Sequence, residues 1–338
     1  HGILGLINHS RFFFGENVAE KINLIIHKLF TRFLINESIK YDVVITWSGC
    51  SLELYKSKKF QKKNKILKII ECGSTHIVHK TNLLEKLYIE NNFKFKYDYK
   101  FFNRELEEYS LADKIFVPSN YVKNTFLKNG VSSNKIYVNP YGVDINKFYL
   151  DKTYNVQKEK IILLFCGNAS LRKGFHLIID ASEYFSAMNI ELWHVGMISR
   201  EIKSYMKNKN LNSIKFLGQI EQKNLRRFYN LANALILPSF EEGLSLVQLQ
   251  SLACGTPIIS SIAAGVEDIT KNTTLYLGET IKSVSKQNIL NSIQLFLDNQ
   301  QKIDKVAIAD YCCKNFSIKS YSDRYQDFLV KNSFKNET

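Results

Sequence analysis

Short runs of apolar residues, many of them β-branched, recur along the chain and are separated by longer stretches with helical character. In the first half these runs are residues 41–46, 66–70, 114–117 and 135–138. In the second half they are residues 161–165, 191–195, 214–216, 235–238 and 257–259. Short buried strands that alternate with helices are typical of a parallel, doubly wound sheet. The pattern therefore predicts an α/β protein with two such sheets in succession.

The polar segment 151–160 interrupts this alternation and is interpreted as a linker. We therefore expect an N-terminal Rossmann-like domain over residues 1–150 and a second Rossmann-like domain over 151–315. A helix within 316–338 is expected to follow, because aromatic residues recur there with the spacing of a helical stripe. Ligands of such sheets bind beyond the carboxyl ends of the strands, so the expected site is a cleft between the two sheets.

Composition supports a packed protein with two domains. The chain has 338 residues, of which 45% are hydrophobic, and this is long enough for two domains of ordinary size. No apolar run approaches the ~20 residues of a membrane-spanning helix. Six cysteines are scattered in apolar contexts without the spacing of metal ligands. We expect most of them to be reduced core residues of a cytoplasmic protein, and we expect no metal site.

Seven lysines between Lys56 and Lys68 form the longest run of like charge, with no acid among them, in a chain of net charge +14. Two interpretations stay open. The run is either a solvated helix face or a basic face that contacts anionic lipid head groups. Nucleic acid is not an expected partner, because no recognition motif or aromatic stacking pattern accompanies the charge.

Residues 235–260 carry the most informative pattern in the chain. A buried strand leads into a loop with Glu242 and Gly243, and a helix begins near Ser245. Free amides at a helix N-terminus bind anions, and the glycine permits close approach to the backbone. Because Glu242 repels an anion, we expect it to hold neutral sugar hydroxyls beside that anion. Gln250, in the helix, can meet a second polyol, and a phosphate with two polyols describes a nucleotide sugar.

Residues 166–174 are a second candidate for anion binding. Gly167 follows a strand and allows a tight turn, and Arg172 and Lys173 precede a helix expected over 175–181. Two cations above a sheet edge, beside a helix N-terminus, suit a diphosphate. The alternative interpretation is an exposed basic turn.

Together the two segments resemble the signature of retaining glycosyltransferases of family 4. The family pattern is Pro-Ser, two variable residues, Glu-Gly-Phe-Gly-Leu, a second Glu eight positions after the first, and Ala-Cys-Gly-x-Pro. Here Glu242 is the first Glu, and the likeness extends over roughly residues 40 to 330. The resemblance implies the GT-B fold, in which two doubly wound Rossmann-like domains face a central cleft, and a terminal helix that crosses back to the first domain.

The chain departs from the family pattern at several positions. Gln250 replaces the second Glu, and residues 244–245 are Leu-Ser where the family has Phe-Gly. Asn168 stands where the family has a phosphate-binding Arg, so Arg172 is expected to supply that contact. The glycine-rich loop that follows the family's first strand is not identifiable. Since the chain begins at His1, we expect a start that is truncated relative to the family.

The resemblance also implies roles for single residues. The diphosphate rests on Arg172, Lys173 and the amides at Leu244–Leu246. Gln250 holds the ribose, less tightly than a carboxylate would, and Glu242 holds hydroxyls of the donor sugar. The two cations neutralise the leaving phosphate in place of a metal ion.

Two further segments complete the expected site. A histidine at the end of a strand in the first domain faces the donor sugar in related enzymes; His76 is favoured over His79 because it lies nearer the strand end. The segment around Gly218 and Ile220 resembles the one that lines the nucleotide base. The expected catalytic residues are His76, Arg172, Lys173 and Glu242. The expected nucleotide-sugar residues are Gly167, Asn168, Arg172, Lys173, Gly218, Ile220, Glu242, Gly243, Leu244, Ser245, Leu246 and Gln250.

The expected function is transfer of a hexose-type sugar, with retention, from a UDP or GDP sugar to a glycan or lipid-linked acceptor in cell-surface polysaccharide synthesis. No cofactor other than this donor substrate is expected. The expected location is cytoplasmic and peripheral on the inner face of the plasma membrane. The open alternatives are an inactive or binding-only relative, a nucleotide-sugar epimerase on a similar fold, and a basic nucleic-acid or membrane adaptor.

Overall fold

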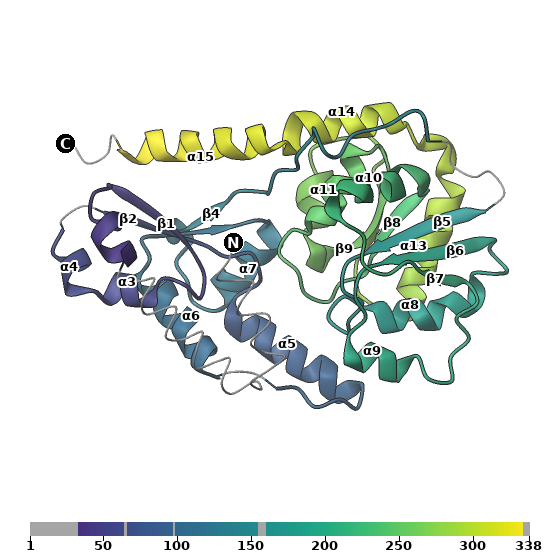
Figure 1. Ribbon diagram of the computed structural model, residues 1–338, viewed down its shortest axis with the longest axis horizontal. Coiled ribbons are helices and arrows are strands. Elements are labelled where there is room, and N and C mark those ends of the chain that lie inside the picture. Colours follow the sequence, from purple (N-terminus) through teal and green to yellow (C-terminus); the bar gives the residue numbers. More distant parts are fainter. Residues whose placement is uncertain (1–32, 64–65, 97–98, 155–159, 334–338) are drawn as a thin grey trace. The chain divides into compact units, whose positions relative to one another are not determined.

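The computed structural model describes residues 33–63, 66–96, 99–154 and 160–333 (Figure 1). The expected truncation at the N-terminus falls on residues outside these ranges. Residue contacts divide the chain into two compact units. Unit 1 holds the described residues up to Cys72, those within Asp98–Phe116, and Ser132–Tyr137. Unit 2 holds the remaining described residues, so the segments that begin at Gly73 and at Val117 belong to the same unit as the second sheet.

The first sheet has four strands in the order β1-β2-β3-β4. Their bounds are β1 Val43–Trp47, β2 Leu67–Glu71, β3 Lys114–Val117 and β4 Ile136–Val138. The pairs β1–β2 and β2–β3 are parallel, with Ile45 opposite Ile69 and Ile70 opposite Ile115. All four strands lie where the hydrophobic runs predict them, to within two residues at each end.

The second sheet has six strands in the order β10-β9-β8-β5-β6-β7, and its neighbouring strands are parallel. Their bounds are β5 Ile161–Cys166, β6 Ile190–Val195, β7 Ile214–Phe216, β8 Ala234–Leu237, β9 Ile258–Ser261 and β10 Gly278–Ile281. Strands β5 and β8 are neighbours in the middle of the sheet. From β5 the chain adds β6 and β7 on one side, and from β8 it adds β9 and β10 on the other side. Parallel strands present their carboxyl ends at one edge, so the loops after β5, β7 and β8 lie on that edge.

Helices cover both faces of the second sheet (Figure 1). Alternate residues of β5 point to opposite faces, as the period of a strand requires. Leu163 and Phe165 pack in a core with α8 (Phe175–Ala181), α9 (Arg200–Tyr205) and α13 (Lys286–Asp298). On the other face Ile162, Leu164 and Cys166 pack in a core with α10 (Gln222–Leu231), α11 (Leu246–Ala253) and α14 (Lys305–Phe316). Burial on both faces explains why these strands are apolar throughout.

Further helices within the described ranges are α3 Leu52–Lys56, α4 Lys58–Gln61, α5 Ile77–Glu90, α6 Tyr99–Leu111, α7 Asn120–Lys128, α12 Val266–Thr270 and α15 Ile318–Ser333. Short 3₁₀ turns are η1 Ser133–Lys135, η2 Ser182–Tyr184, η3 Ile262–Ala264 and η4 Gln300–Lys302. The helix expected at the C-terminus forms as α15. Its Arg324 donates to the side-chain oxygen of Asn139 at 2.8 Å and to the carbonyl oxygen of Pro140 at 2.6 Å.

The described lysines of the run lie on α3, on α4, in the turn after α4 and on β2. Acids from other parts of unit 1 pair with three of them. Lys56 pairs with Glu107, Lys63 lies 3.8 Å from Asp42, and Lys68 lies 3.4 Å from Asp113. These pairs lower the local charge below what the sequence run suggests. Among the described residues, none of the helices is both long enough and apolar enough to span a bilayer.

Candidate functional site

The turn after β5 presents two cations at the carboxyl edge of the second sheet. Gly167 has φ of 134°, and Gly174, which precedes α8, has φ of 69°, so both adopt backbone conformations that favour glycine. A Cβ at Gly174 would lie 2.1 Å from the carbonyl oxygen of Pro238. The glycine thus lets the β5 turn pack against the end of β8, and this packing places Arg172 and Lys173 beside the loop after β8.

The loop after β8 and helix α11 form as the sequence predicts. The helix is Leu246–Ala253, with Ser245 as its N-cap residue, although the Ser245 side chain makes no capping hydrogen bond. A Cβ at Gly243 would lie 2.2 Å from the carbonyl oxygen of Gly73, so this glycine makes room for the segment that leads into α5. Ser119 donates to the carbonyl oxygen of Gly243 at 2.8 Å and holds the loop from another side.

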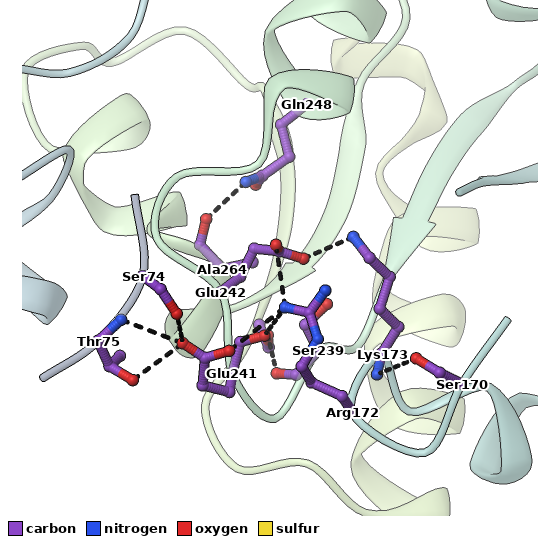
Figure 2. A network of polar contacts seen from close by, with 11 residues as sticks. Ser74, Thr75, Ser170, Arg172, Lys173, Ser239, Glu241, Glu242, Gln248 and Ala264 are labelled. Carbon is purple, nitrogen blue, oxygen red and sulfur yellow. Dashed lines mark hydrogen bonds and ion pairs between the residues drawn. The ribbon is translucent and has the colours of Figure 1, made fainter. Parts of the chain in front are cut away.

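Arg172, Lys173, Glu241 and Glu242 form one charge cluster (Figure 2). The Nζ of Lys173 lies 2.5 Å from Oε2 of Glu242, and Nη1 of Arg172 lies 3.2 Å from Oε1 of the same carboxylate. The side chains of Lys173, Glu242 and Arg172 are 11%, 17% and 32% exposed, so the pairs are partly shielded from water. Two cations and two carboxylates give the cluster a formal charge of zero.

Glu241 was not identified from the sequence, yet its carboxylate is fully buried. Its Oε1 accepts hydrogen bonds from Oγ of Ser74 at 2.6 Å, from the amide of Thr75 at 3.1 Å and from Oγ1 of Thr75 at 2.9 Å. Burial acts to raise the pKa of this carboxyl. The Ser74 hydrogen bond, the charges of Lys80 and Arg172, and the Thr75 amide outweigh burial and hold the pKa below its ordinary value.

Gln250 lies on the second turn of α11, where Tyr229 of α10 contacts its side chain. The hydroxyl of Tyr229 donates to its Oε1 at 2.8 Å. Tyr229 is fully buried at the end of α10, and burial, with the neighbouring Cys166, raises the pKa of its phenol well above the usual range. The tyrosine therefore stays a hydrogen-bond donor to the side-chain oxygen of Gln250.

The two candidate histidines have different surroundings. His76 is buried and is the N-cap of α5, where its Nδ1 accepts from the amide of Val78 at 3.3 Å. Burial and the nearby His79 lower the pKa of His76 to about 4, so its ring is neutral at pH 7. His79 lies three residues on, against Tyr121, and among the described residues nothing bonds to its buried Nε2. A role for either ring in the chemistry stays a prediction.

The other predicted residues lie at the carboxyl edge of the second sheet. Asn168 is exposed immediately after β5, and the carbonyl oxygen of Gly218, after β7, accepts from the amide of Gly196 at 2.8 Å. Leu244 is buried in the core, whereas Leu246 is 45% exposed at the start of α11. The structure thus gathers residues from three loops at one edge. Within the described ranges, His, Cys, Asp and Glu side chains form no group that could hold a metal ion.

Comparison with known proteins agrees with this architecture. Residues 147–310 match the family model described as glycosyl transferases group 1. An uncharacterised glycosyltransferase of Methanocaldococcus jannaschii is 27% identical over 185 residues, which cover 55% of this chain and 48% of that protein. The chain spans about half the length, or less, of the curated relatives at the top of the comparison.

Two solved structures show the same fold. Sucrose-phosphate synthase from Thermosynechococcus elongatus superposes with a TM-score of 0.70 at 20% identity, covering 88% of this chain and 75% of that chain. HepE of Anabaena, solved in complex with UDP, superposes with a TM-score of 0.64 at 16% identity, covering 89% of this chain and 82% of that chain. These likenesses confirm the predicted GT-B fold with its two parallel sheets.

Proposed function

Because residues 147–310 match the family model of glycosyl transferases group 1, we propose that this chain transfers a hexose from a nucleoside-diphosphate sugar to a hydroxyl acceptor with retention of configuration. One observation carries the proposal. Arg172 and Lys173 stand together at the carboxyl edge of a doubly wound sheet, beside the N-terminus of α11, where a diphosphate would meet two cations and free amides.

The charge cluster suggests how a donor would enter. With no anion bound, Glu242 is the counter-ion of Lys173 and Arg172. We propose that the diphosphate takes over these two cations and that the released Glu242 carboxylate turns to hydroxyls of the donor sugar. A carboxylate accepts hydrogen bonds from two hydroxyls and repels a phosphate. Glu242 would therefore bind the sugar hydroxyls only after the diphosphate has replaced it as the counter-ion of the two cations.

The rest of the donor site follows from the same edge of the sheet. We propose that Gln250 offers its amide to the ribose, supported by Tyr229, and that the loop with Gly218 and Ile220 lines the base. UDP is the first candidate nucleotide, because HepE, a similar structure, was solved with UDP. Arg172 and Lys173 would stabilise the departing phosphate without a metal ion.

We propose a glycan or lipid-linked acceptor in cell-surface polysaccharide synthesis, approached from the side of the cytoplasm. The exposed lysines on and directly after α4, which are Lys58, Lys59 and Lys62, are the proposed contact with anionic lipid.

Lys173→Ala tests the diphosphate site. Its loss removes a charged hydrogen bond worth about 1.5–3 kcal/mol, so the Kd for the bare nucleoside diphosphate should rise by about tenfold or more. Titration calorimetry with UDP and with GDP measures this, after a thermal-shift screen selects the nucleotide; at ~100 times its Kd a ligand stabilises the fold by ~2.7 kcal/mol.

A matched control separates the site from a general charge effect. Lys319 is 82% exposed on α15 and pairs with Asp323, so Lys319→Ala removes the same charge without touching the cluster. Its affinity should equal that of the wild type. Equal affinities for all three proteins would show that the diphosphate binds elsewhere.

A further inference from the structure

Glu241 connects two segments that lie far apart in the sequence (Figure 2). One carboxylate oxygen, Oε1, takes all three donors from Ser74 and Thr75, which immediately precede α5. The other oxygen, Oε2, lies 3.3 Å from Nη1 of Arg172. The side chain is fully buried, so solvent does not substitute for any of these partners.

Every partner of this carboxylate is a hydrogen-bond donor. An ionised carboxylate accepts through both oxygens, whereas a glutamine amide has one acceptor oxygen and one NH₂ donor. Wherever the NH₂ of a glutamine was placed, it would face either the Ser74–Thr75 donors or the guanidinium of Arg172. The position therefore demands a charged side chain, which agrees with the lowered pKa of Glu241.

The same contacts orient Arg172. Its Nη1 donates to the main-chain oxygen of Glu241 at 2.9 Å and faces both Glu241 and Glu242 carboxylates. In the part of the chain that the structure describes, the hydrogen bonds of this guanidinium all leave from Nη1. The other edge of the planar fork, Nε and Nη2, is left to face a ligand. Since Asn168 carries no charge, Arg172 supplies the guanidinium in the turn after β5.

The two neighbouring carboxylates thus differ in kind. Glu242 is partly exposed, and its ion pairs with described residues are those to the two cations, so an incoming anion can replace it. Glu241 is enclosed and bonded to a separate segment, so it stays in place. We infer that Glu241 is a positioning residue, whose carboxylate holds the Ser74–Thr75 segment and the Arg172 fork in register for sugar transfer. This inference rests on the proposed function.

Glu241→Gln gives a distinctive split between binding and turnover. Loss of a buried negative charge beside Arg172 does not weaken the attraction for an anion, so the Kd for UDP should stay within about threefold of the wild type or fall. Arg172 keeps its charge and its hydrogen bonds to the main-chain oxygen of Glu241 and to Glu242, so it stays close enough to attract UDP. The small shift of the fork and the release of the Ser74–Thr75 segment should instead lower kcat for UDP-glucose hydrolysis by about tenfold or more, since small displacements of positioned groups are costly in the transition state. GDP and GDP-mannose are the alternative pair, chosen by the wild-type thermal shift.

Glu108 supplies the matched control. It is also fully buried, accepts from the amides of Gly49, Ser51 and Leu52, and lies 3.4 Å from an arginine, Arg104. All these partners belong to unit 1. Glu108→Gln should lower the melting temperature as Glu241→Gln does, while kcat for donor hydrolysis and the Kd for UDP stay at wild-type values.

A second arm needs no nucleotide. In hydrogen exchange of the free proteins, Glu241→Gln should speed deuterium uptake over residues 74–80 and Glu108→Gln should not. If the wild type binds neither UDP nor GDP, the proposed donor site fails, and this arm still decides whether Glu241 holds the segment before α5. Thr75→Val, which removes one donor and leaves the carboxylate charged, serves if Glu241→Gln does not fold; it should lower kcat by about threefold.

Three results would overturn the inference. The first is wild-type kcat in Glu241→Gln. The second is a parallel loss of kcat and UDP affinity together with a lower melting temperature, which marks a merely structural residue. The third is unchanged exchange over residues 74–80 in Glu241→Gln.

Discussion

Glu242→Gln probes the ion pairs that close the charge cluster. The substitution keeps the shape of the side chain and removes the charge that faces Lys173 at 2.5 Å and Arg172 at 3.2 Å. A charged hydrogen bond contributes about 1.5–3 kcal/mol, and the amide oxygen retains part of it. Partial exposure of the three side chains screens the remainder. We therefore expect the free energy of unfolding of the ligand-free protein to fall by about 1–2 kcal/mol.

The same substitution should separate nucleotide binding from turnover. In the wild type, UDP must displace Glu242 from two cations, whereas in the variant it displaces only a neutral amide. The affinity for bare UDP should therefore stay equal or rise by up to about tenfold, which is about 1.4 kcal/mol. Turnover of UDP-glucose should fall by about tenfold or more, because a neutral amide binds the sugar hydroxyls less strongly than a carboxylate.

Three measurements check this reasoning. Urea unfolding gives the stability, titration calorimetry the UDP affinity, and a coupled assay of UDP release the turnover. Glu183→Gln is the control, because Glu183 is 52% exposed and pairs with Lys286 away from the cluster. Losses of UDP affinity and of turnover by the same factor would refute the assignment of Glu242 to the sugar, and unchanged stability would refute the strength given to its ion pairs.

The remaining predictions concern the ribose, the membrane and pH. In calorimetry, Gln250→Glu should keep or tighten the affinity for UDP. Gln250→Ala should weaken this affinity by about 1 kcal/mol or more, since a hydrogen bond of about that strength is lost. Wild-type affinity of the alanine variant would show that α11 does not face the ribose. In co-sedimentation, the wild type should bind vesicles that contain anionic lipid at low salt and should dissociate from them at high salt. Replacing lysines 58, 59, 62 and 63 by Gln should abolish vesicle binding and leave the affinity for UDP unchanged. A wild type that ignores such vesicles would leave the lysines a solvated face. Because the folded state lowers the pKa of Glu241, its charge stabilises the fold above the unfolded-state pKa of about 4.3, and this stability is lost as the pH falls through the lower folded-state pKa. Wild type and Glu241→Gln should therefore differ most in urea unfolding at pH 7 and converge in acid; a constant difference would contradict the shift.

The sequence alone was sufficient for five of the six strands of the second sheet and for the edge where the site lies. It missed the edge strand β10, Gly278–Ile281, whose residues Gly-Glu-Thr-Ile contain no apolar run. Helix α8 has the predicted bounds, Phe175–Ala181, and β7 has the predicted bounds, Ile214–Phe216. These predictions succeed because buried parallel strands are apolar on both faces and because glycine and proline mark where each element ends. Because β5 and β8 are parallel, the loops that follow them, which carry Lys173 and Glu242, must lie at the same carboxyl edge of the sheet.

Other features depended on the tertiary structure. Glu241 and Glu242 are adjacent acids in one loop, and nothing local distinguishes them. The segment with Ser74 and Thr75, more than 160 positions away in the sequence, folds against one of them and supplies its donors. The seven lysines likewise read as an unbroken positive run until Glu107, Asp42 and Asp113 are brought beside them. Sequence periodicity records which side chains are buried, but the partner of a buried charge is a long-range contact, and only the folded chain selects it.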